Sequence, residues 1–339
     1  MMKDLAGGAV SGSPARQPFV LSEPALAGVV FVVLGLLPAL LSGYVIYILP
    51  QYMLFGMLAM SLGLLWGFGG MLSFGHAAFF ALGAYSMGLA MHSGEQWLNP
   101  AYLALIAAPL AAAVIAGLVG YFLFSAGVRD SYFVIVTLAL SIIAEQIAVS
   151  QSQITGGWNG MFISRMALTL GPSVQIPLDG DVAMYYSVLP AVAGTYFLLR
   201  WLTRIKFGKV LVGIRENEDR VVSLGFNTSL YKTAIFALSA AIAGIAGALY
   251  GTHAAFVAPS LGNVLFSTEV VVWVAIGGRN SLLGALLGGI IVASLSNYLS
   301  AITPEYWQLV LGVLFVAVIA YFKGGVAGAI SQLPIFRKS

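Results

Sequence analysis

Long stretches without a charged residue dominate the hydrophobic pattern of this chain. No Asp, Glu, Lys or Arg lies between Glu23 and Glu95, and further charge-free stretches cover residues 96–128, 233–268 and 280–304. A helix needs about 20 apolar residues to cross the roughly 30 Å hydrocarbon core of a bilayer. We therefore predict an all-α, polytopic transmembrane helical bundle of about ten spans. The predicted spans are 26–47, 51–70, 71–91, 101–125, 131–149, 183–201, 232–251, 267–278, 281–300 and 306–323.

The composition supports a membrane protein. Of the 339 residues, 60% are hydrophobic and only 8% are charged, whereas a soluble domain has roughly 45–50% apolar and about 25% charged residues. The first 22 residues contain no short apolar segment before a small-residue cleavage site, so we expect no removable signal peptide. Cysteine is absent, which excludes disulfides and thiolate metal sites. We predict no metal site.

The basic residues predict the orientation in the membrane. Seven of the fifteen Lys and Arg residues lie between Arg200 and Lys232, and short loops rich in these residues stay in the cytoplasm. Counting crossings from there predicts cytoplasmic tails at 1–25 and 324–339, a membrane domain at 26–323 and a cytoplasmic loop at 202–231. Because the basic residues flank apolar spans rather than forming a soluble patch, the bilayer is the expected partner and nucleic acid is not.

The chain lacks the residue patterns of the common enzymes. We find no His-Glu-x-x-His, no Gly-x-Ser-x-Gly and no Gly-x-x-x-x-Gly-Lys-[Ser/Thr] phosphate loop, and the three histidines, 76, 92 and 253, are far apart in sequence. We therefore expect no catalytic residue, no bound cofactor and no ATP hydrolysis by this chain. An ion-coupled carrier would bury more ionisable groups near the membrane midplane. That class is disfavoured but stays open.

Charged residues inside apolar spans are candidates for a transport pathway, because burying a charge there is costly. Glu145 and Glu269 lie towards the outer ends of their predicted spans, so a position at the membrane interface is about as well supported as a pathway role. His76 lies near the inner end of its span, where a helix-end hydrogen bond or packing role is favoured over a proton relay.

Two glycine-rich segments and one turn supply further candidates. Most glycines in the spans are expected to let helices pack closely. Ser73 and Ser281, however, each follow a tryptophan and a pair of glycines, and interrupted spans in corresponding places can line a transport pathway. Trp158 and Asn159 lie in the segment TGGWNG, which predicts a tight outer turn. Trp158 there is also a candidate interface anchor.

One cytoplasmic segment concentrates charge: residues 215–220, RENEDR, hold five charges in six positions. Apolar residues on both sides and Gly225 as a stop predict a short amphipathic helix at 213–224. A lipid-binding helix would be dominated by Lys and Arg, and an idle solvated loop would not need an apolar stripe. Docking of the helix into a groove of a partner protein fits the pattern best.

Four segments together resemble a known family. They are LLWGFGGMLSFGHAAFFALGAYSMG, DSYFVIVTLALSIIAEQI followed by ITGGWNGM, FGKVLVGIRENEDRVVSLGFNTSLYKTAIFALSAAIAGIAGALYG, and TEVVVWVAIGGRNSLLGALLGG with PEYWQLVLGVLFVAV. They span about residues 52–326 and resemble the inner-membrane permeases of branched-chain amino acid ABC importers, whose related branch moves urea and short amides.

The resemblance implies an assembly. Residues 212–225 would be the coupling helix, seated on one of two cytoplasmic ATP-binding subunits that use ATP and Mg²⁺. The other expected partners are a homologous second permease and a periplasmic substrate-binding protein, all at a bacterial inner membrane. The implied coupling residues are Arg215, Glu216, Glu218, Asp219, Arg220 and Gly225.

Different segments of the chain resemble different branches of the family, which transport different substrates. The ITGGWNG turn is similar to the amino acid branch, whereas residues 273–279 and 304–307 are similar to the urea and amide branch. We expect transport of branched-chain, hydrophobic amino acids, with urea or short-chain amides as the alternative.

Overall fold

The computed structural model describes residues 23–41, 43–93, 99–128, 130–169, 175–177, 180–306, 309–313 and 315–316. The predicted all-α class is confirmed, with only two short strand pairs, β1–β4 and β2–β3, in the described part. The helices are α1 (Glu23–Leu40), α2 (Tyr44–Gly63), η1 (Leu64–Phe68), α3 (His76–Ser93), α4 (Pro100–Ser125), α5 (Asp130–Ser150), α6 (Ser152–Thr155), η2 (Gly157–Asn159), α7 (Asp181–Arg204), α8 (Lys206–Glu216), α9 (Glu218–Ser223), α10 (Thr228–Ala254), η3 (Pro259–Gly262), α11 (Val264–Gly277) and α12 (Leu282–Ile302). The strands are β1 (Met161–Phe162), β2 (Ala167–Thr169), β3 (Gln175–Pro177) and β4 (Phe256–Val257).

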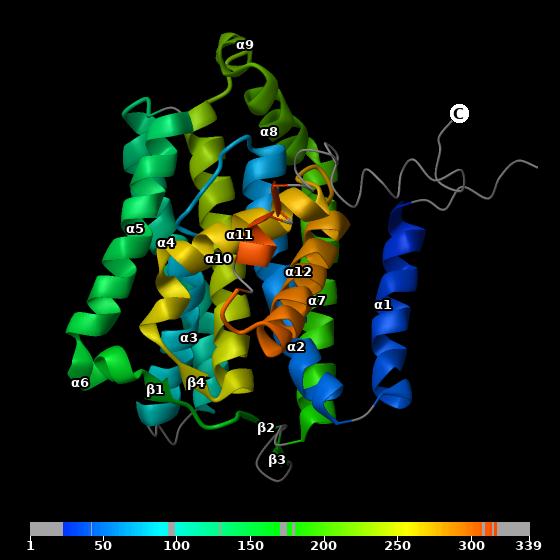
Figure 1. Cartoon of the computed structure of the whole chain (residues 1–339). Helices are drawn as coiled ribbons and strands as arrows, with labels where there is room; N and C mark the ends of the chain where they lie inside the picture. The colour runs from blue at the N-terminus through cyan, green and yellow to red at the C-terminus, as the bar shows by residue number, and fades with distance from the viewer. Residues whose placement is uncertain are drawn as a thin grey trace, which may run out of the picture.

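The long helices run side by side between two ends of the molecule (Figure 1). Helices α8 and α9 project from one end, and α6 and the strands lie at the other. In the described part, six helices are long and apolar enough to cross a membrane, and α1 and α11 are shorter apolar helices. The predicted count of ten is not confirmed. The six are Tyr44–Phe68, Pro100–Ser125, Ser131–Ser150, Asp181–Arg204, Thr228–Ala254 and Leu282–Ile302.

Three predicted boundaries near the N-terminus are wrong. The span predicted at 26–47 is divided, because the chain reverses at Gly43, whose φ of 66° suits glycine. The helix predicted at 51–70 begins at Tyr44 instead and runs to Phe68. The span predicted at 71–91 begins only at His76, after a non-helical segment at 69–75.

The two ends of the chain are only partly described. Helix α1 starts at Glu23, inside the tail predicted at 1–25. The remainder of that tail, most of the span predicted at 306–323 and the whole tail predicted at 324–339 lie outside the described residues.

Helices α3, α4 and α10 pack through glycine and alanine, and we call them the α10 group. A Cβ added to Gly247 would lie 1.8 Å from the Phe80 carbonyl oxygen, and one on Gly83 would lie 2.0 Å from that of Gly244. The buried face of α4 consists mainly of small residues, which lets α10 approach closely. They are Ala101, Ala104, Ala108, Ala112, Ala116 and Gly120.

Helices α2, α11 and α12, with η1, pack in the same way and form what we call the α2 group. A Cβ on Gly277 would lie 2.1 Å from the Gly284 carbonyl oxygen, and one on Gly289 would lie 2.6 Å from the Cα of Gly56. The expectation that glycines pack the helices is confirmed at these positions.

Aromatic rings fill the space between the two groups. The ring of Phe55 on α2 lies 6.1 Å from Phe80 of α3 and 5.6 Å from Tyr250 of α10, centroid to centroid. On its other side are Phe266 at 5.5 Å and Trp273 at 5.1 Å, both on α11. Close glycine contacts thus lie within each group, and these aromatic side chains form much of the packing where α2 and α11 meet α3 and α10.

Candidate coupling site

The charged segment 215–220 forms a break between two helices, not the single helix predicted at 213–224. Asn217 is extended (φ −161°, ψ 98°), and its side-chain oxygen accepts a hydrogen bond from the Arg220 amide at 2.9 Å. Asparagine is a favoured N-cap because it satisfies one of the free amides of a first turn. The cap starts a new helix, α9, at Glu218, which explains why the prediction of one continuous helix at 213–224 is wrong. Gly225, at φ 87°, ends the segment as predicted.

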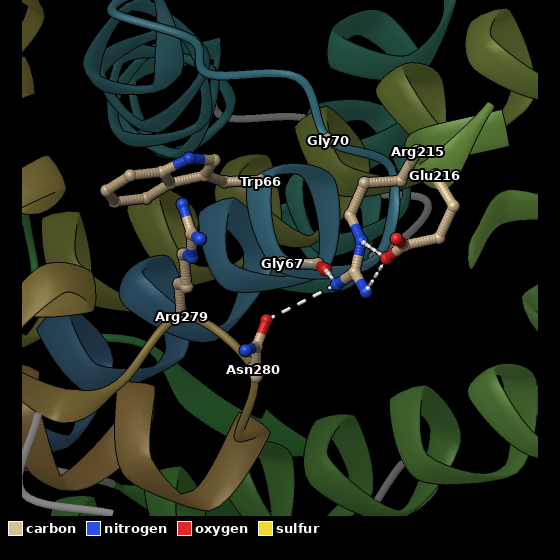
Figure 2. A pocket seen from close by; sticks show the side chains of 7 residues that line it. All are labelled: Trp66, Gly67, Gly70, Arg215, Glu216, Arg279 and Asn280. Carbon is tan, nitrogen blue, oxygen red and sulfur yellow. Dashed lines mark hydrogen bonds and ion pairs between the residues drawn. The ribbon is translucent and has the colours of Figure 1, made fainter. Parts of the chain in front are cut away.

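Arg215, the penultimate residue of α8, connects that helix to two distant parts of the chain (Figure 2). Its Nη1 donates to the Gly67 carbonyl in η1 and, at 3.3 Å, to Oδ1 of Asn280 in the loop between α11 and α12. Nε and Nη2 donate to one carboxylate oxygen of Glu216, at 3.2 and 2.7 Å. One guanidinium therefore joins α8 to both elements.

The chemistry of η1 explains why a guanidinium lies there. The helix Tyr44–Phe68 ends at this point, where its carbonyls carry the negative end of the helix dipole. The amides of residues 69–71 bond the preceding three carbonyls of this turn, and the Gly67 carbonyl accepts from Arg215 instead. Gly67 also touches the α11–α12 loop directly, because a Cβ on it would lie 1.8 Å from the Arg279 carbonyl oxygen. The Arg279 guanidinium lies over the Trp66 ring, 6.0 Å from its centroid. Together these residues line a pocket of about 290 Å³.

Glu218, on the other side of Asn217, contacts a different part of the bundle. Its Oε2 lies 2.5 Å from Nζ of Lys232 in α10. The Lys232 ammonium is also 5.8 Å from the centroid of the Phe124 ring at the end of α4. Glu218 is therefore engaged within this chain, although the family resemblance placed it among the residues facing an ATP-binding subunit.

Part of the predicted apolar stripe is also used internally. Ile214 and Val221 are buried against the bundle. Val222 and Leu224 remain 52% and 71% exposed, and Phe226 is 40% exposed. Exposed apolar side chains that gather outside the membrane spans mark an interaction site. We define the tip surface as Val222, Leu224 and Phe226 with the exposed charged residues Glu216, Asp219 and Arg220.

The tip surface lies at the more basic end of the molecule. Residues 205–227, the end of α4 and the α11–α12 loop are all at the end from which α8 and α9 project (Figure 1). The basic residues described near this end are Arg200, Arg204, Lys206, Lys209, Arg215, Arg220, Lys232 and Arg279. At the opposite end the described part has Arg165, which is 3.5 Å from Asp181. This asymmetry is the one that cytoplasmic loops show.

Three pathway candidates make hydrogen bonds at or beside helix ends. Ser73 is buried, and its hydroxyl accepts from the Gly75 amide at 3.1 Å. Ser281 caps α12 by accepting from the Gly284 amide at 3.0 Å. His76 starts α3, and its Nε2 lies 2.6 Å from the Ser239 hydroxyl. Since that hydroxyl donates to the Ser61 carbonyl, Nε2 is the donor in the histidine contact.

The other pathway candidates make no described hydrogen bond to these three residues. Glu145 on α5 and Glu269 on α11 are each partly buried. Trp158 and Asn159 are exposed in η2, at the end opposite the tip surface. The described contacts do not join these residues into one site. Within the same described part, no group of three or more His, Cys, Asp or Glu side chains is placed to hold a metal ion.

A cluster of buried hydroxyls around the non-helical segment 69–75 was missed from the sequence. Thr137 accepts from the Phe74 amide at 3.1 Å, and Ser141 donates to the Phe74 carbonyl at 2.7 Å. Ser267 lies 3.1 Å from Ser141 and accepts from the Ala77 amide at 3.3 Å. Backbone that leaves a helix inside a membrane needs such partners. The available signal was the hydroxyl residues within otherwise apolar spans.

Residues 44–319 match the family model described as branched-chain amino acid transport system / permease component. The chain belongs to this family. It is a permease component of an ABC transporter and an integral membrane protein. The LivM permease protein of the high-affinity branched-chain amino acid transport system of Escherichia coli (strain K12) is 28% identical to it over 336 residues, which cover 94% of this permease and 76% of the relative.

Sugar permeases match shorter parts of this permease. The xylose transport system permease protein XylH of Escherichia coli (strain K12) is 31% identical over 115 residues, 32% of this permease and 29% of the relative. The fructose import permease protein FrcC of Rhizobium meliloti is 29% identical over 149 residues, 42% and 41% of the two chains. No solved structure matches this permease.

Proposed function

We propose that this permease forms part of the path by which an ABC importer moves branched-chain, hydrophobic amino acids across a bacterial inner membrane. The observation that carries the substrate class is the extent of the LivM match, which covers 94% of the chain, whereas the match to the xylose permease covers 32%. Urea or short-chain amides are the alternative, favoured by the likeness of residues 273–279 and 304–307 to that branch.

The importer contains four kinds of subunit in this proposal. Two cytoplasmic ATP-binding subunits hold ATP and Mg²⁺, a homologous permease completes the path, and a periplasmic binding protein delivers the substrate. This permease binds no cofactor and hydrolyses no ATP, since its sequence has no phosphate loop. Both of its termini are cytoplasmic, on the side of the tip surface.

The tip surface is the contact with an ATP-binding subunit. Its apolar residues, Val222 and Leu224, are exposed beyond the bundle, where lipid does not cover them. Its charges are of both signs, which suits a protein partner better than an anionic membrane. Arg215 and Glu218, which bind within the chain, position this surface rather than forming it.

The pathway candidates fall into three roles in the proposal. Glu145 and Glu269 line the path, since they are the acidic residues within the apolar stretches of α5 and α11. Ser73, His76 and Ser281 hold the helix ends beside it. Trp158 and Asn159, exposed at the opposite end from α9, lie near the outer entrance.

Reconstitution tests this function. The four kinds of subunit are placed in proteoliposomes, and uptake of radiolabelled leucine, urea and xylose is measured with and without ATP inside. We expect ATP-dependent uptake of leucine, abolished when the ATP-binding subunits are omitted and unaffected by an uncoupler. Uptake of urea or xylose without leucine would overturn the substrate assignment. Uptake by this permease alone that collapses with an uncoupler would establish an ion-coupled carrier instead.

A further inference from the structure

The tip surface is attached to the bundle by two contacts that lie on opposite sides of Asn217. On one side Arg215 binds Gly67 and Asn280, which belong to η1 and the α11–α12 loop. On the other side Glu218 binds Lys232 of α10. The first contact therefore reaches the α2 group and the second reaches the α10 group. The four residues 215–218 thus connect the two groups at this end of the bundle.

We propose that Arg215, Asn217 and Glu218 form a two-armed latch that converts a displacement of the tip surface into a relative movement of the α2 and α10 groups. Arg215 is the arm on the α2 group, Glu218 is the arm on the α10 group, and Asn217 is the pivot between them. The proposal rests on the proposed function, because it takes the ATP-binding subunits as the source of the displacement.

The Arg215 arm binds η1 and the α11–α12 loop, which contact each other and move together in this proposal. The backbone contact between Gly67 and the Arg279 carbonyl holds η1 against the α11–α12 loop, and the cation–π contact between Arg279 and Trp66 supports it. A guanidinium presents several donors in a fixed plane, so Arg215 reaches Gly67 and Asn280 simultaneously from one Nη1 and keeps Glu216 on its other edge. Lysine would supply a charge at this place but not the same planar set of donors.

The pivot is a single residue. The backbone of Asn217 is extended between the last turn of α8 and the first turn of α9, so α8 and α9 are not one rigid rod. Its amide donates to the Gly213 carbonyl at 2.9 Å and its side chain accepts from the Arg220 amide at 2.9 Å. The residue is thus bonded to both helices at the point where the helical path is interrupted, and hinges are commonly found at such element ends.

The two groups have a contact surface that suits such a movement. Between them lie the rings around Phe55, and the His76–Ser239–Ser61 hydrogen bonds join α3 and α10 to α2. Side-chain packing of this kind has alternative arrangements, whereas the glycine contacts within each group do not tolerate displacement. A pull at the latch would therefore move the groups against each other before it deformed either one.

The same contacts could have a purely structural role, which we call a static clasp. The ratio of transport to ATP hydrolysis distinguishes a static clasp from the proposed latch. Loss of a clasp would lower stability, assembly, hydrolysis and uptake together. Loss of a latch arm leaves the ATP-binding subunits docked and hydrolysing while the membrane helices no longer follow, so uptake falls and hydrolysis stays. Arg215→Gln removes the charge of one arm, and Arg204→Gln removes the same charge from an exposed position near this end of α7.

The experiment uses the complete importer in proteoliposomes, with the substrate that the wild-type importer moves. We expect Arg215→Gln to lower uptake at least about tenfold, a fall equivalent to one charge-assisted hydrogen bond. Binding-protein-stimulated ATP hydrolysis should stay within about twofold. We expect Arg215→Lys to recover part of the uptake and Arg204→Gln to match the wild type. A parallel fall of uptake and hydrolysis in Arg215→Gln, or no fall in either, overturns the latch.

The Glu218–Lys232 arm gives an independent test, which can be carried out even if the Arg215→Gln variant does not fold. Glu218→Lys and Lys232→Glu are each expected to uncouple uptake from hydrolysis, and the double exchange is expected to restore at least half of the coupling. Failure of the exchange to restore any coupling overturns the Glu218 arm. Each ratio of uptake to ATP hydrolysis is normalised to that of the wild type with the same substrate. An importer that moves urea or a sugar would therefore contradict the proposed substrate, but the latch would still be tested.

Discussion

Lys232 Nζ lies 2.5 Å from Glu218 Oε2, and the two side chains are buried to different extents. The lysine side chain is 8% exposed, whereas that of the glutamate is 32% exposed. The pair therefore fastens α9 to α10, with the lysine side chain buried in the protein and the glutamate side chain partly in water. Removing Glu218 and removing Lys232 therefore have different consequences. If its partner is lost, Glu218 can be hydrated where it lies, whereas the Lys232 ammonium cannot be hydrated without movement of the chain.

The first prediction follows from this asymmetry. Glu218→Ala leaves the Lys232 ammonium buried without a counter-charge, which we expect to destabilise the chain by about 1–3 kcal/mol. Lys232→Met keeps an unbranched apolar stem beside Phe124 and leaves Glu218 to water, so we expect less than about 1 kcal/mol. Thermal unfolding of the purified variants in detergent ranks them. A lower melting temperature for Lys232→Met than for Glu218→Ala would contradict the assignment.

The second prediction concerns the α10 group. Gly247→Ala places a Cβ 1.8 Å from the Phe80 carbonyl oxygen, so α3 and α10 must separate. We expect a loss of about 1–3 kcal/mol, the usual cost of overpacking, seen as a lower melting temperature in detergent. Gly194→Ala in α7 is the matched control, because nothing lies within 4 Å of the added Cβ. It should be neutral or raise stability by up to about 1 kcal/mol through helix propensity.

The third prediction concerns the tip surface. Leu224 is 71% exposed, so Leu224→Glu should change the stability of the chain by less than about 0.5 kcal/mol. An apolar anchor at the centre of an interface is worth about 2 kcal/mol or more, and we expect co-purification of the ATP-binding subunits to fall sharply. Asp219→Lys should weaken it as well. Trp158→Gln, equally exposed at the opposite end, is the control. Full recovery of the ATP-binding subunits with both variants would rule out docking at this surface.

The fourth prediction concerns sidedness, and the absence of cysteine makes it direct to test. Ser223→Cys, in α9, and Asn159→Cys, in η2, introduce single exposed thiols at opposite ends of the bundle. A membrane-impermeant maleimide added to intact spheroplasts should label Asn159→Cys and should label Ser223→Cys only after the membrane is opened. The reverse pattern would place the tip surface outside the cell.

The class of fold and several spans could be predicted from the sequence, because hydrophobic length is a strong signal in a membrane protein. The helix predicted at 101–125 is Pro100–Ser125, and that predicted at 131–149 is Asp130–Ser150. Errors arose where the apolar pattern continued through a change of direction. Gly43 and the segment 69–75 interrupt helices inside one long charge-free stretch, and hydrophobicity does not distinguish a glycine that packs from a glycine that turns.

The position of the candidate site could be predicted from the sequence, but the contacts of its side chains could not. The concentration of charge at 215–220 marked the correct segment, yet the partners of its side chains are far away in the chain. Gly67 lies 148 residues before Arg215. Nothing in the local pattern indicates that Arg215 and Glu218 bind distant parts of this chain. Nor does a helical pattern reveal that Asn217 caps a new helix rather than continuing the old one.

Photo-cross-linking from the tip surface tests the central claim most directly, that an ATP-binding subunit moves this permease by holding the segment after Asn217. A photoreactive amino acid replaces Leu224 in cells that co-express the ATP-binding subunits, and a second strain carries it in place of Trp158. Irradiation should join position 224 to an ATP-binding subunit and should give no such product from position 158. Products with the ATP-binding subunit from position 158, or none from position 224, would contradict the account.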